Sequence, residues 1–259
     1  LERELEFDFN ADDERRLLSY IRAHGGASFE ADYREPLDAI LARSDGADSL
    51  VADSGREVLL ARAVIKVKPN GTAQRYYRRV TKINNENGAR DLDRFPIGLA
   101  RGEQEVRVLT ATVRHADGTI EEARTGRSGA RSLRFVVDLP PLVPGDVVDL
   151  EWRLDDLRST FFGEYFGLKH SFMPGGSVSV RESDIVLLTP KELPLQFHSR
   201  GFDSGITAKP EPFENGYTRH QYTLHDLIPP RLEPGMPPAR EAGAWLEASS
   251  YTSWDAFGS

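Results

Sequence analysis

Cysteine is absent from the 259-residue sequence, and so are long hydrophobic runs and an excess of basic residues. Without cysteine, this chain can form no disulfide, thiolate metal site or cysteine nucleophile. No apolar run approaches the roughly 18 residues of a transmembrane helix, so we expect no membrane-spanning segment. The 33 Lys and Arg residues against 41 Asp and Glu give a formal net charge of −8. This charge disfavours nucleic acid or an anionic membrane as the main partner.

The composition that remains is that of a globular protein. Hydrophobic residues make up 39% of the chain and charged residues 29%, which is enough apolar material for a sizeable core. The length fits either one large all-β unit or two ordinary domains. The sequence begins at Leu1, without an initiator methionine or the layout of a signal peptide, so we expect it to be a piece of a longer chain.

The first 50 residues have a helical pattern. Asn10 is a suitable N-cap for an amphipathic helix that would end at Gly25. A second helix is predicted to begin with Pro36 in its first turn and to end near Ser44. Two short helices form a poor core alone, and this segment is similar to the end of a helical, tetratricopeptide-type array.

From Arg56 onward the hydrophobic period changes to two. Every odd position from Leu59 to Val67 is apolar, which predicts a half-buried strand. Asn70-Gly71 then supplies the positive φ angles of a tight hairpin turn. Asp117-Gly118 predicts a second hairpin of the same kind.

Further strands follow to the C-terminal side of these hairpins. In the segment 148–154, apolar residues alternate with charged residues that are expected on the opposite face. Other strands are predicted within 133–139, 176–190, 193–201 and 217–227. Seven or more strands without interleaved helices predict a mainly β protein, an antiparallel β-sandwich with a short helical N-terminal segment.

Proline and composition divide the chain into three parts. We predict a helical segment over 1–50, a β-sandwich domain over 51–228 and a proline-rich strap and linker over 229–259. Five prolines between Ile228 and Pro238 remove five N–H donors, so this stretch should lie outside the strand ladder.

Residues that could carry chemistry are few. A metal or acid–base site would need several of the six histidines to converge with a carboxylate. His220 and His225 are five residues apart, so on a regular strand they would point to opposite faces. Phosphate-binding loops and a nucleophile elbow are missing from the sequence. We therefore predict no catalytic residue, no metal site and no cofactor in this chain.

Aromatic residues are the best candidates for contact surfaces. The segment 161–166 either fills the sandwich core or packs against another domain or ligand. Large apolar residues beyond the strap are expected to pack between the sandwich and a following domain, the alternative being that they dock wholly on the sandwich. The candidate interdomain contacts are Phe161, Phe162, Tyr165, Phe166, Trp245, Tyr251 and Trp254.

A second group of candidates lies on the return strand of the first hairpin. Arginines flank Tyr76-Tyr77 and could stack on a sugar or a base, but the acidic total favours an ordinary solvated strand face. The arginines are Arg75, Arg78 and Arg79.

Five segments, in this order, resemble the bacterial domain-of-unknown-function family 3857, an all-β domain that precedes a transglutaminase-like (papain-like) core. They are VIKVKPNG at 64–71, RVTKI at 79–83, ADGT at 116–119, PGDVVDLEW at 144–152 and SSYTSW at 249–254. The resemblance covers about residues 50–259. In that family the core begins shortly after the last of these segments, so this chain would stop just before it.

The resemblance implies a non-catalytic accessory or interaction domain whose partner is a transglutaminase-like domain in the same polypeptide. The Cys, His and Asp residues of that core have no counterparts in this chain. The alternative is a carbohydrate- or peptide-binding module with a protein, peptide or glycan ligand. The resemblance also favours a bacterial envelope or secreted protein.

Overall fold

The computed structural model describes residues 28–100, 102–127, 134–159, 165–173, 178–202, 210–230, 233, 235 and 243–251. The chain divides into two units, residues 1–34 and residues 35–259. The described part of the first unit contains a 3-10 helix, η1 (Ala31–Tyr33). The first predicted helix, between Asn10 and Gly25, lies outside the described residues.

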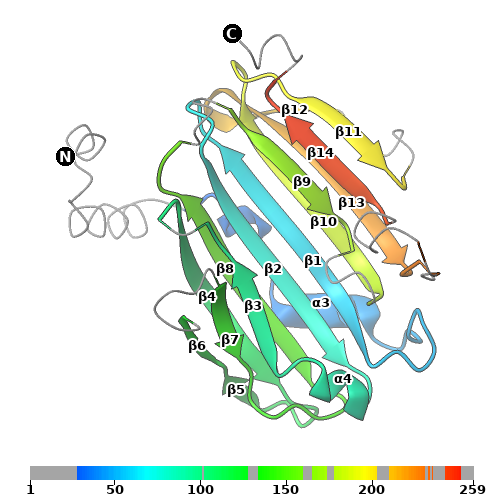
Figure 1. The fold of residues 1–259 in the computed structure, drawn as a ribbon. Helices are drawn as coiled ribbons and strands as arrows, with labels where there is room; N and C mark the ends of the chain where they lie inside the picture. The colour runs from blue at the N-terminus through cyan, green and yellow to red at the C-terminus, as the bar shows by residue number, and fades with distance from the viewer. Residues whose placement is uncertain are drawn as a thin grey trace. The chain divides into compact units, whose positions relative to one another are not determined.

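The second unit is mainly β, as the sequence predicts. Its large sheet has the strand order β12 (Glu211–Phe213), β13 (Tyr217–Leu227), β10 (Val180–Pro190), β1 (Arg56–Val67), β2 (Ala73–Ile83), β8 (Val147–Asp156), β4 (Gln104–Arg114) and β5 (Ile120–Glu122). One three-stranded sheet has the order β11 (Gln196–Arg200), β14 (Trp245–Ser249) and β9 (Gly167–Ser171). The other has the order β3 (Arg94–Gly98), β7 (Arg134–Asp138) and β6 (Arg124–Arg127). Two short helices, α4 (Glu86–Arg90) and η3 (Glu214–Gly216), lie between strands (Figure 1).

The first predicted hairpin is confirmed. Strands β1 and β2 pair antiparallel along their whole length. The turn closes with the Gly71 N–H donating to the Lys68 carbonyl at 2.9 Å, and Gly71 has a φ of 77° that favours glycine. The second hairpin is confirmed as well, because Gly118 has a φ of 88° between β4 and β5.

Both small sheets pack on the same face of the large sheet. Beneath β9, β14 and β11 lies one apolar core that includes Ile65, Ile185 and Leu246. Beneath β3, β7 and β6 lies a second core that includes Trp152. Tyr77, on the central strand β2, packs against both cores, so the covered face is continuous from one small sheet to the other.

The opposite face of the large sheet carries the second predicted helix. This helix, α3 (Leu37–Ser44), begins after Pro36 as the sequence predicts. Its Ile40 is 1% exposed and packs against Leu60 and Val80 of the central strands. The helix therefore covers a part of the sheet that faces away from both small sheets.

The expectation that the central strands are half-buried is wrong. Strand β1 is buried at alternate and intervening positions alike, and so is β8. The charged residues of β8 that were expected on a solvated face are buried, among them Asp149 and Glu151 at 4% exposed. The reason is topological: both strands lie inside an eight-stranded sheet and are covered on both faces, which a two-residue period cannot reveal.

Arginine pairs neutralise the buried carboxylates. The Arg78 guanidinium donates to both carboxylate oxygens of Asp149, at 3.0 and 2.8 Å, and lies 3.4 Å from Glu151. The solvated strand face expected for Arg78 is therefore wrong, because its side chain is 2% exposed. Such bidentate pairs are what allow charges to occupy a covered sheet.

Two details of the topology differ from the sequence-based expectation. Strands β1 and β10 pair parallel, whereas every other strand pair in the described chain is antiparallel. Within 229–259, assigned to a strap and linker, Trp245–Ser249 form β14 in the middle of a small sheet. The stretch after β13 lies outside the ladder at its described residues, as its prolines predict.

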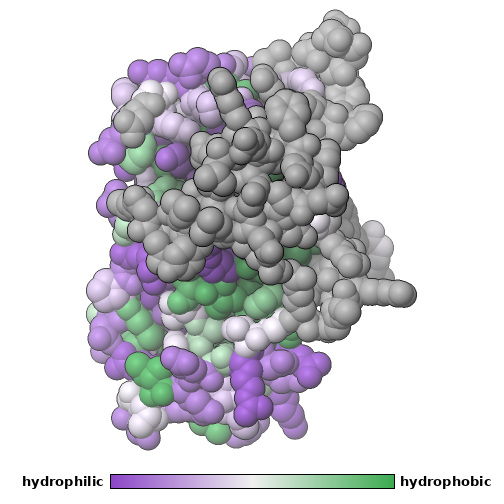
Figure 2. Space-filling model, turned by 90° about the vertical axis from the view of Figure 1, so that its left-hand side faces the viewer, coloured by the Kyte–Doolittle hydropathy of each residue, from purple (hydrophilic) through white to green (hydrophobic). Residues whose placement is uncertain are grey.

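The described surface is largely polar. Figure 2 shows hydrophilic residues over most of the described part of one side, with a smaller group of hydrophobic residues between them. Among the described residues, no helix is both long and apolar enough to span a membrane.

A second buried network joins α3 to the large sheet. Arg62 of β1 donates to Asp184 at 2.9 Å and lies within 3.2 Å of Glu182 and 2.9 Å of Glu35. Three carboxylates thus share Arg62 and the nearby Arg43. Burial raises the pKa of Asp184 from its usual 3.8 to about 6, against the opposing effect of Arg62.

This network predicts a dependence of stability on pH. A raised folded-state pKa means that the contribution of Asp184 to the unfolding free energy is complete below pH 3.8 and is lost as the pH rises through about 6. We expect Asp184→Asn to remove part of the stability gain that the wild type shows when the pH falls from about 7 to 5. Urea unfolding at several pH values measures it, with the exposed Glu122→Gln as the matched control. Equal pH dependence of the wild type and Asp184→Asn would contradict the assignment.

Candidate functional site

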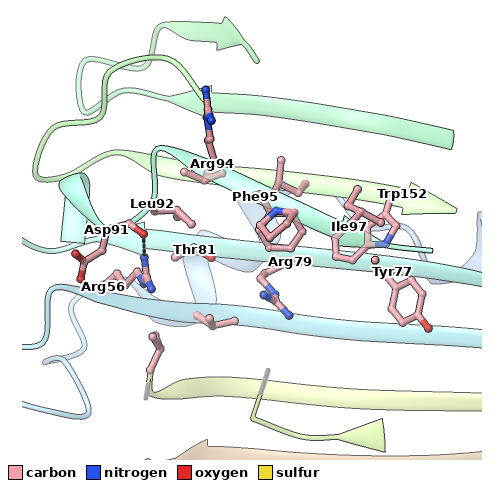
Figure 3. Close-up of a pocket in the computed structure, with 16 residues that line it drawn as sticks. Arg56, Tyr77, Arg79, Thr81, Asp91, Leu92, Arg94, Phe95, Ile97 and Trp152 are labelled. Atoms are coloured by element: carbon pink, nitrogen blue, oxygen red, sulfur yellow. Dashed lines mark hydrogen bonds between the residues drawn. The ribbon is translucent and has the colours of Figure 1, made fainter. Parts of the chain in front are cut away.

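A cavity of about 500 Å³ lies between the large sheet and β3. Strands β1, β2 and β8 form its floor, and all five residues of β3 line its wall (Figure 3). We call it the arginine pocket and define it by Arg56, Arg79, Phe95 and Trp152, which all line it. Its volume lies within the range of typical small-ligand sites.

Aromatic rings form the apolar end of the arginine pocket. The rings of Tyr77 and Trp152 stack with centroids 5.3 Å apart, and the Phe95 ring lies 5.3 Å from Trp152 in a tilted arrangement. Tyr77 and Trp152 are directly opposite in the register of β2 and β8, which puts both rings on the face that the small sheets cover. Burial raises the pKa of the Tyr77 hydroxyl, so it stays protonated at neutral pH.

Arg79 is the notable charge in this pocket. Its guanidinium carbon lies 5.0 Å from the centroid of the Phe95 ring, a cation–π geometry. In the part of the chain that the structure describes, no carboxylate forms an ion pair with it. Burial, and secondarily the charge of Arg56, lower the pKa of Arg79 to about 10, so it is still a cation at neutral pH.

The other arginines near Arg79 have partners. On the same strand, Arg75 pairs with Asp156 at 2.6 Å. At the pocket rim, Arg94 pairs with Asp138 at 2.9 Å. Inside the pocket, Arg56 donates to the backbone carbonyl of Asp91 at 2.8 Å.

His170 adds a second buried polar group near Arg79. It lies on β9, and its ring makes an edge contact with Phe172 at 5.0 Å. Its Nε2 atom is buried and has no hydrogen-bond partner in the described structure. Burial, and secondarily the charge of Arg79, lower the pKa of His170 to about 4, so the imidazole is neutral at neutral pH.

A second candidate lies on the three-stranded sheet that contains β14, with Tyr165 and Tyr251 beyond the Ser249 end of that strand and Trp245 at its other end. The Tyr165 and Tyr251 rings stack with centroids 4.8 Å apart, and both residues are partly exposed. Lys169 sits 4.6 Å over the ring of the partly exposed Trp245. We call Tyr165, Trp245 and Tyr251 the aromatic surface.

The local sequence explains how Tyr165 is held. Gly167 begins β9, and a Cβ atom there would lie 2.1 Å from the Tyr165 hydroxyl. The glycine therefore leaves the room that the tyrosine ring occupies. The backbone next to Tyr165 is tied to the backbone next to Tyr251, because the Ser250 N–H donates to the Phe166 carbonyl at 2.9 Å.

The predicted contact residues fall into three groups. Tyr165, Trp245 and Tyr251 form the aromatic surface. Phe166 is 2% exposed in the core, the position expected if its segment fills the core. Outside the described residues lie Phe161, Phe162 and Trp254.

The histidines occupy separate environments. His220 and His225 lie on a strand with no register shift, so they point to opposite faces as the sequence predicts. His220 lies 3.2 Å from the Thr189 hydroxyl, whereas His115 lies 3.0 Å from the Asp146 carboxylate. No group of three or more metal-ligating side chains occurs among the described residues.

Tyr76 and Tyr77 do not form one binding platform. Tyr76 is fully buried on one face of β2, and Tyr77 points to the other face, into the arginine pocket. The sequence singled out Arg79 but not the pocket. The sequence could have indicated the pocket in one way. Arg79 lies on the apolar face of β2, and its register partner on β8 is Leu150.

Comparisons with known proteins agree with this architecture. The model of the family described as "Domain of Unknown Function with solved-structure structure (DUF3857)" matches residues 69–231. A crystal structure of a "putative protease" from Parabacteroides distasonis has the same fold, with a TM-score of 0.66, 16% identity, and coverage of 79% of this chain and 42% of that one. An M1 zinc metallopeptidase from Deinococcus radiodurans has a TM-score of only 0.41 at 13% identity, covering 77% of this chain and 44% of its own. A search of curated proteins found no match.

The role of Gly167 can be tested with a second strand glycine as control. We expect Gly167→Ala to displace the Tyr165 ring and to lower the unfolding free energy by about 1 kcal/mol, the scale of one aromatic pair. Gly126→Ala in β6, where a Cβ meets nothing within 4 Å, should be neutral or stabilising. Urea unfolding and near-ultraviolet circular dichroism measure both. If the two variants behave alike, Gly167 does not hold the ring.

Proposed function

Because the chain belongs to the DUF3857 family and spans 42% of the length of a structure with the same fold, we propose that it is a non-catalytic accessory domain of a longer protein. Its role in this proposal is to contact and orient a following domain of the transglutaminase-like (papain-like) type. The observation that carries the proposal is the aromatic surface of Tyr165, Trp245 and Tyr251.

The aromatic surface has the properties of a contact site. Tyrosine and tryptophan dominate the energetics of protein interfaces because they offer large contact areas with few rotatable bonds. The tyrosine rings are already ordered by stacking on each other. The ion pair between Lys169 and Glu247, at 3.1 Å, holds the lysine over Trp245. Little side-chain entropy would then be lost on contact with a partner.

The polar side chains of the large sheet fit an accessory role. Buried carboxylates such as Asp149 and Asp184 are bound by arginines in structural pairs. Such pairs hold these two carboxylates in place and leave them without the freedom of a general base. A binding role without chemistry in this chain agrees with that distribution.

A second candidate function is a ligand-binding module. The arginine pocket favours it, because it combines a cavity of about 500 Å³, an aromatic end and a charge without a carboxylate partner in the described chain. The two functions use different surfaces and do not exclude each other.

Amide hydrogen exchange tests the accessory role. We expect residues 243–251 to exchange more slowly in a protein that extends beyond Ser259 through the following domain than in the present chain. Trp245→Ala should reduce this added protection, whereas Ile120→Ala, which removes an exposed apolar side chain on β5, should not. Equal strong protection in the short and extended proteins would mean that the sandwich alone holds this segment, and the proposal would be wrong.

A further inference from the structure

We propose that the arginine pocket binds a carboxylate on a short apolar body, with the Arg79 guanidinium as its ion-pairing group and the aromatic end as the site of the apolar body. This proposal stands apart from the accessory role, because it concerns a different small sheet and a different set of residues.

The charge balance of the pocket points to an anionic ligand. Arg56 and Arg79 both line it, and neither forms an ion pair with a carboxylate in the described chain. The one acid in the lining, Asp91, lies beside Arg56, at the end of the pocket away from Trp152 (Figure 3). Arg79 is half-buried in the pocket, and a cation that is partly withdrawn from water is costly without a counter-charge. An anion that enters beside Arg79 supplies it.

The neighbouring arginines show that this chain does pair its buried cations. Arg78, the residue before Arg79, has two bonds to Asp149, and Arg75 has a carboxylate at 2.6 Å. Three arginines on one strand thus differ in one respect: the side chain that faces the cavity is the one without a carboxylate. The lowered pKa of Arg79 agrees with this, because a paired cation would be stabilised.

The other lining residues determine which uncharged group of a ligand fits the pocket. Beyond the arginines, apolar side chains such as Phe95, Leu150 and Trp152 surround the cavity. A phenyl ring or short alkyl chain would bury its surface there. A single negative charge needs only Arg79 as its partner, whereas a phosphate dianion would need a second cation, and Arg56 already donates to the Asp91 carbonyl at the other end of the pocket. Carboxylate therefore fits better than phosphate.

Strand β3 limits how a ligand can enter. It is an edge strand of its sheet, and Pro96 at its middle has no N–H to donate. A long peptide that adds along this edge as a new strand would lose the central hydrogen bond. We infer end-on entry of the carboxylate, either from a small organic acid or from a peptide terminus.

Binding measurements with matched probes test the proposal on the unaltered chain. The probes are 3-phenylpropionate, its neutral amide 3-phenylpropanamide, phenyl phosphate, and the peptide acetyl-Gly-Gly-Phe with a free or an amidated C-terminus. By calorimetry or protein-observed NMR, we expect the two carboxylates to bind roughly tenfold or more tightly than their amides, the scale of one charge-assisted hydrogen bond. The tighter of the two carboxylates identifies the source.

Two variants locate the charge that is responsible. Arg79→Gln should weaken 3-phenylpropionate roughly tenfold and leave 3-phenylpropanamide unchanged. Arg158→Gln is the matched control, because Arg158 lies outside the pocket lining and is an exposed arginine paired with Glu103 at 3.3 Å. It should change neither affinity by more than about twofold, as is typical of exposed charges.

Three results would overturn the proposal: equal binding of acids and amides, tighter binding of phenyl phosphate than of 3-phenylpropionate, or equal effects of the Arg79 and Arg158 variants. The comparison of acid with amide needs no substitution, so it decides the matter even if Arg79→Gln does not fold. A failure here would leave the accessory role untouched, because that role is tested on residues 243–251.

Discussion

The structure depends on the burial of both faces of the central strands. Strands β1, β2 and β8 lie between two small sheets on one side and the α3 face on the other, so their charged side chains have little access to water. Each such charge must then be neutralised nearby. The bidentate contact of Arg78 with Asp149 and the contacts of Arg62 with three carboxylates follow from that constraint.

The same constraint makes the arginine pocket unusual within this sheet. Between the large sheet and β3 lies a cavity that Arg79 faces, where its guanidinium lies over the Phe95 ring. Evolution of a merely structural strand would favour an apolar residue at such a position, because an apolar side chain removes the desolvation cost. The proposed carboxylate ligand offers a reason for the arginine, and the partly exposed aromatic surface offers a separate place for contact with a second domain.

Local signals in the sequence were sufficient for the hairpins, α3 and most strands. Gly71 takes the positive φ of the turn while the Asn70 side chain accepts from Thr72, and Pro36 marks the start of α3. Long-range pairing was not accessible in this way. Nothing within 245–249 indicates that it inserts between β9 and β11, and nothing in the charged alternation of β8 distinguishes a solvated face from one sealed by arginines. The pocket depends on where β3 lies relative to β2, which is a property of the tertiary structure.

The central claim is that the arginines of β2 hold structural ion pairs except Arg79, which is half-buried at the pocket. The unfolding free energies of Arg78→Met and Arg79→Met, two adjacent residues on one strand, test it most directly. Arg78→Met leaves Asp149 without its partner and should lower the unfolding free energy by about 3–5 kcal/mol. Arg79→Met removes a cation that has no ion pair in the described chain, so it should cost less than about 1 kcal/mol, the scale of its cation–π contact, or stabilise the protein. A loss for Arg79→Met as large as that for Arg78→Met would contradict the account.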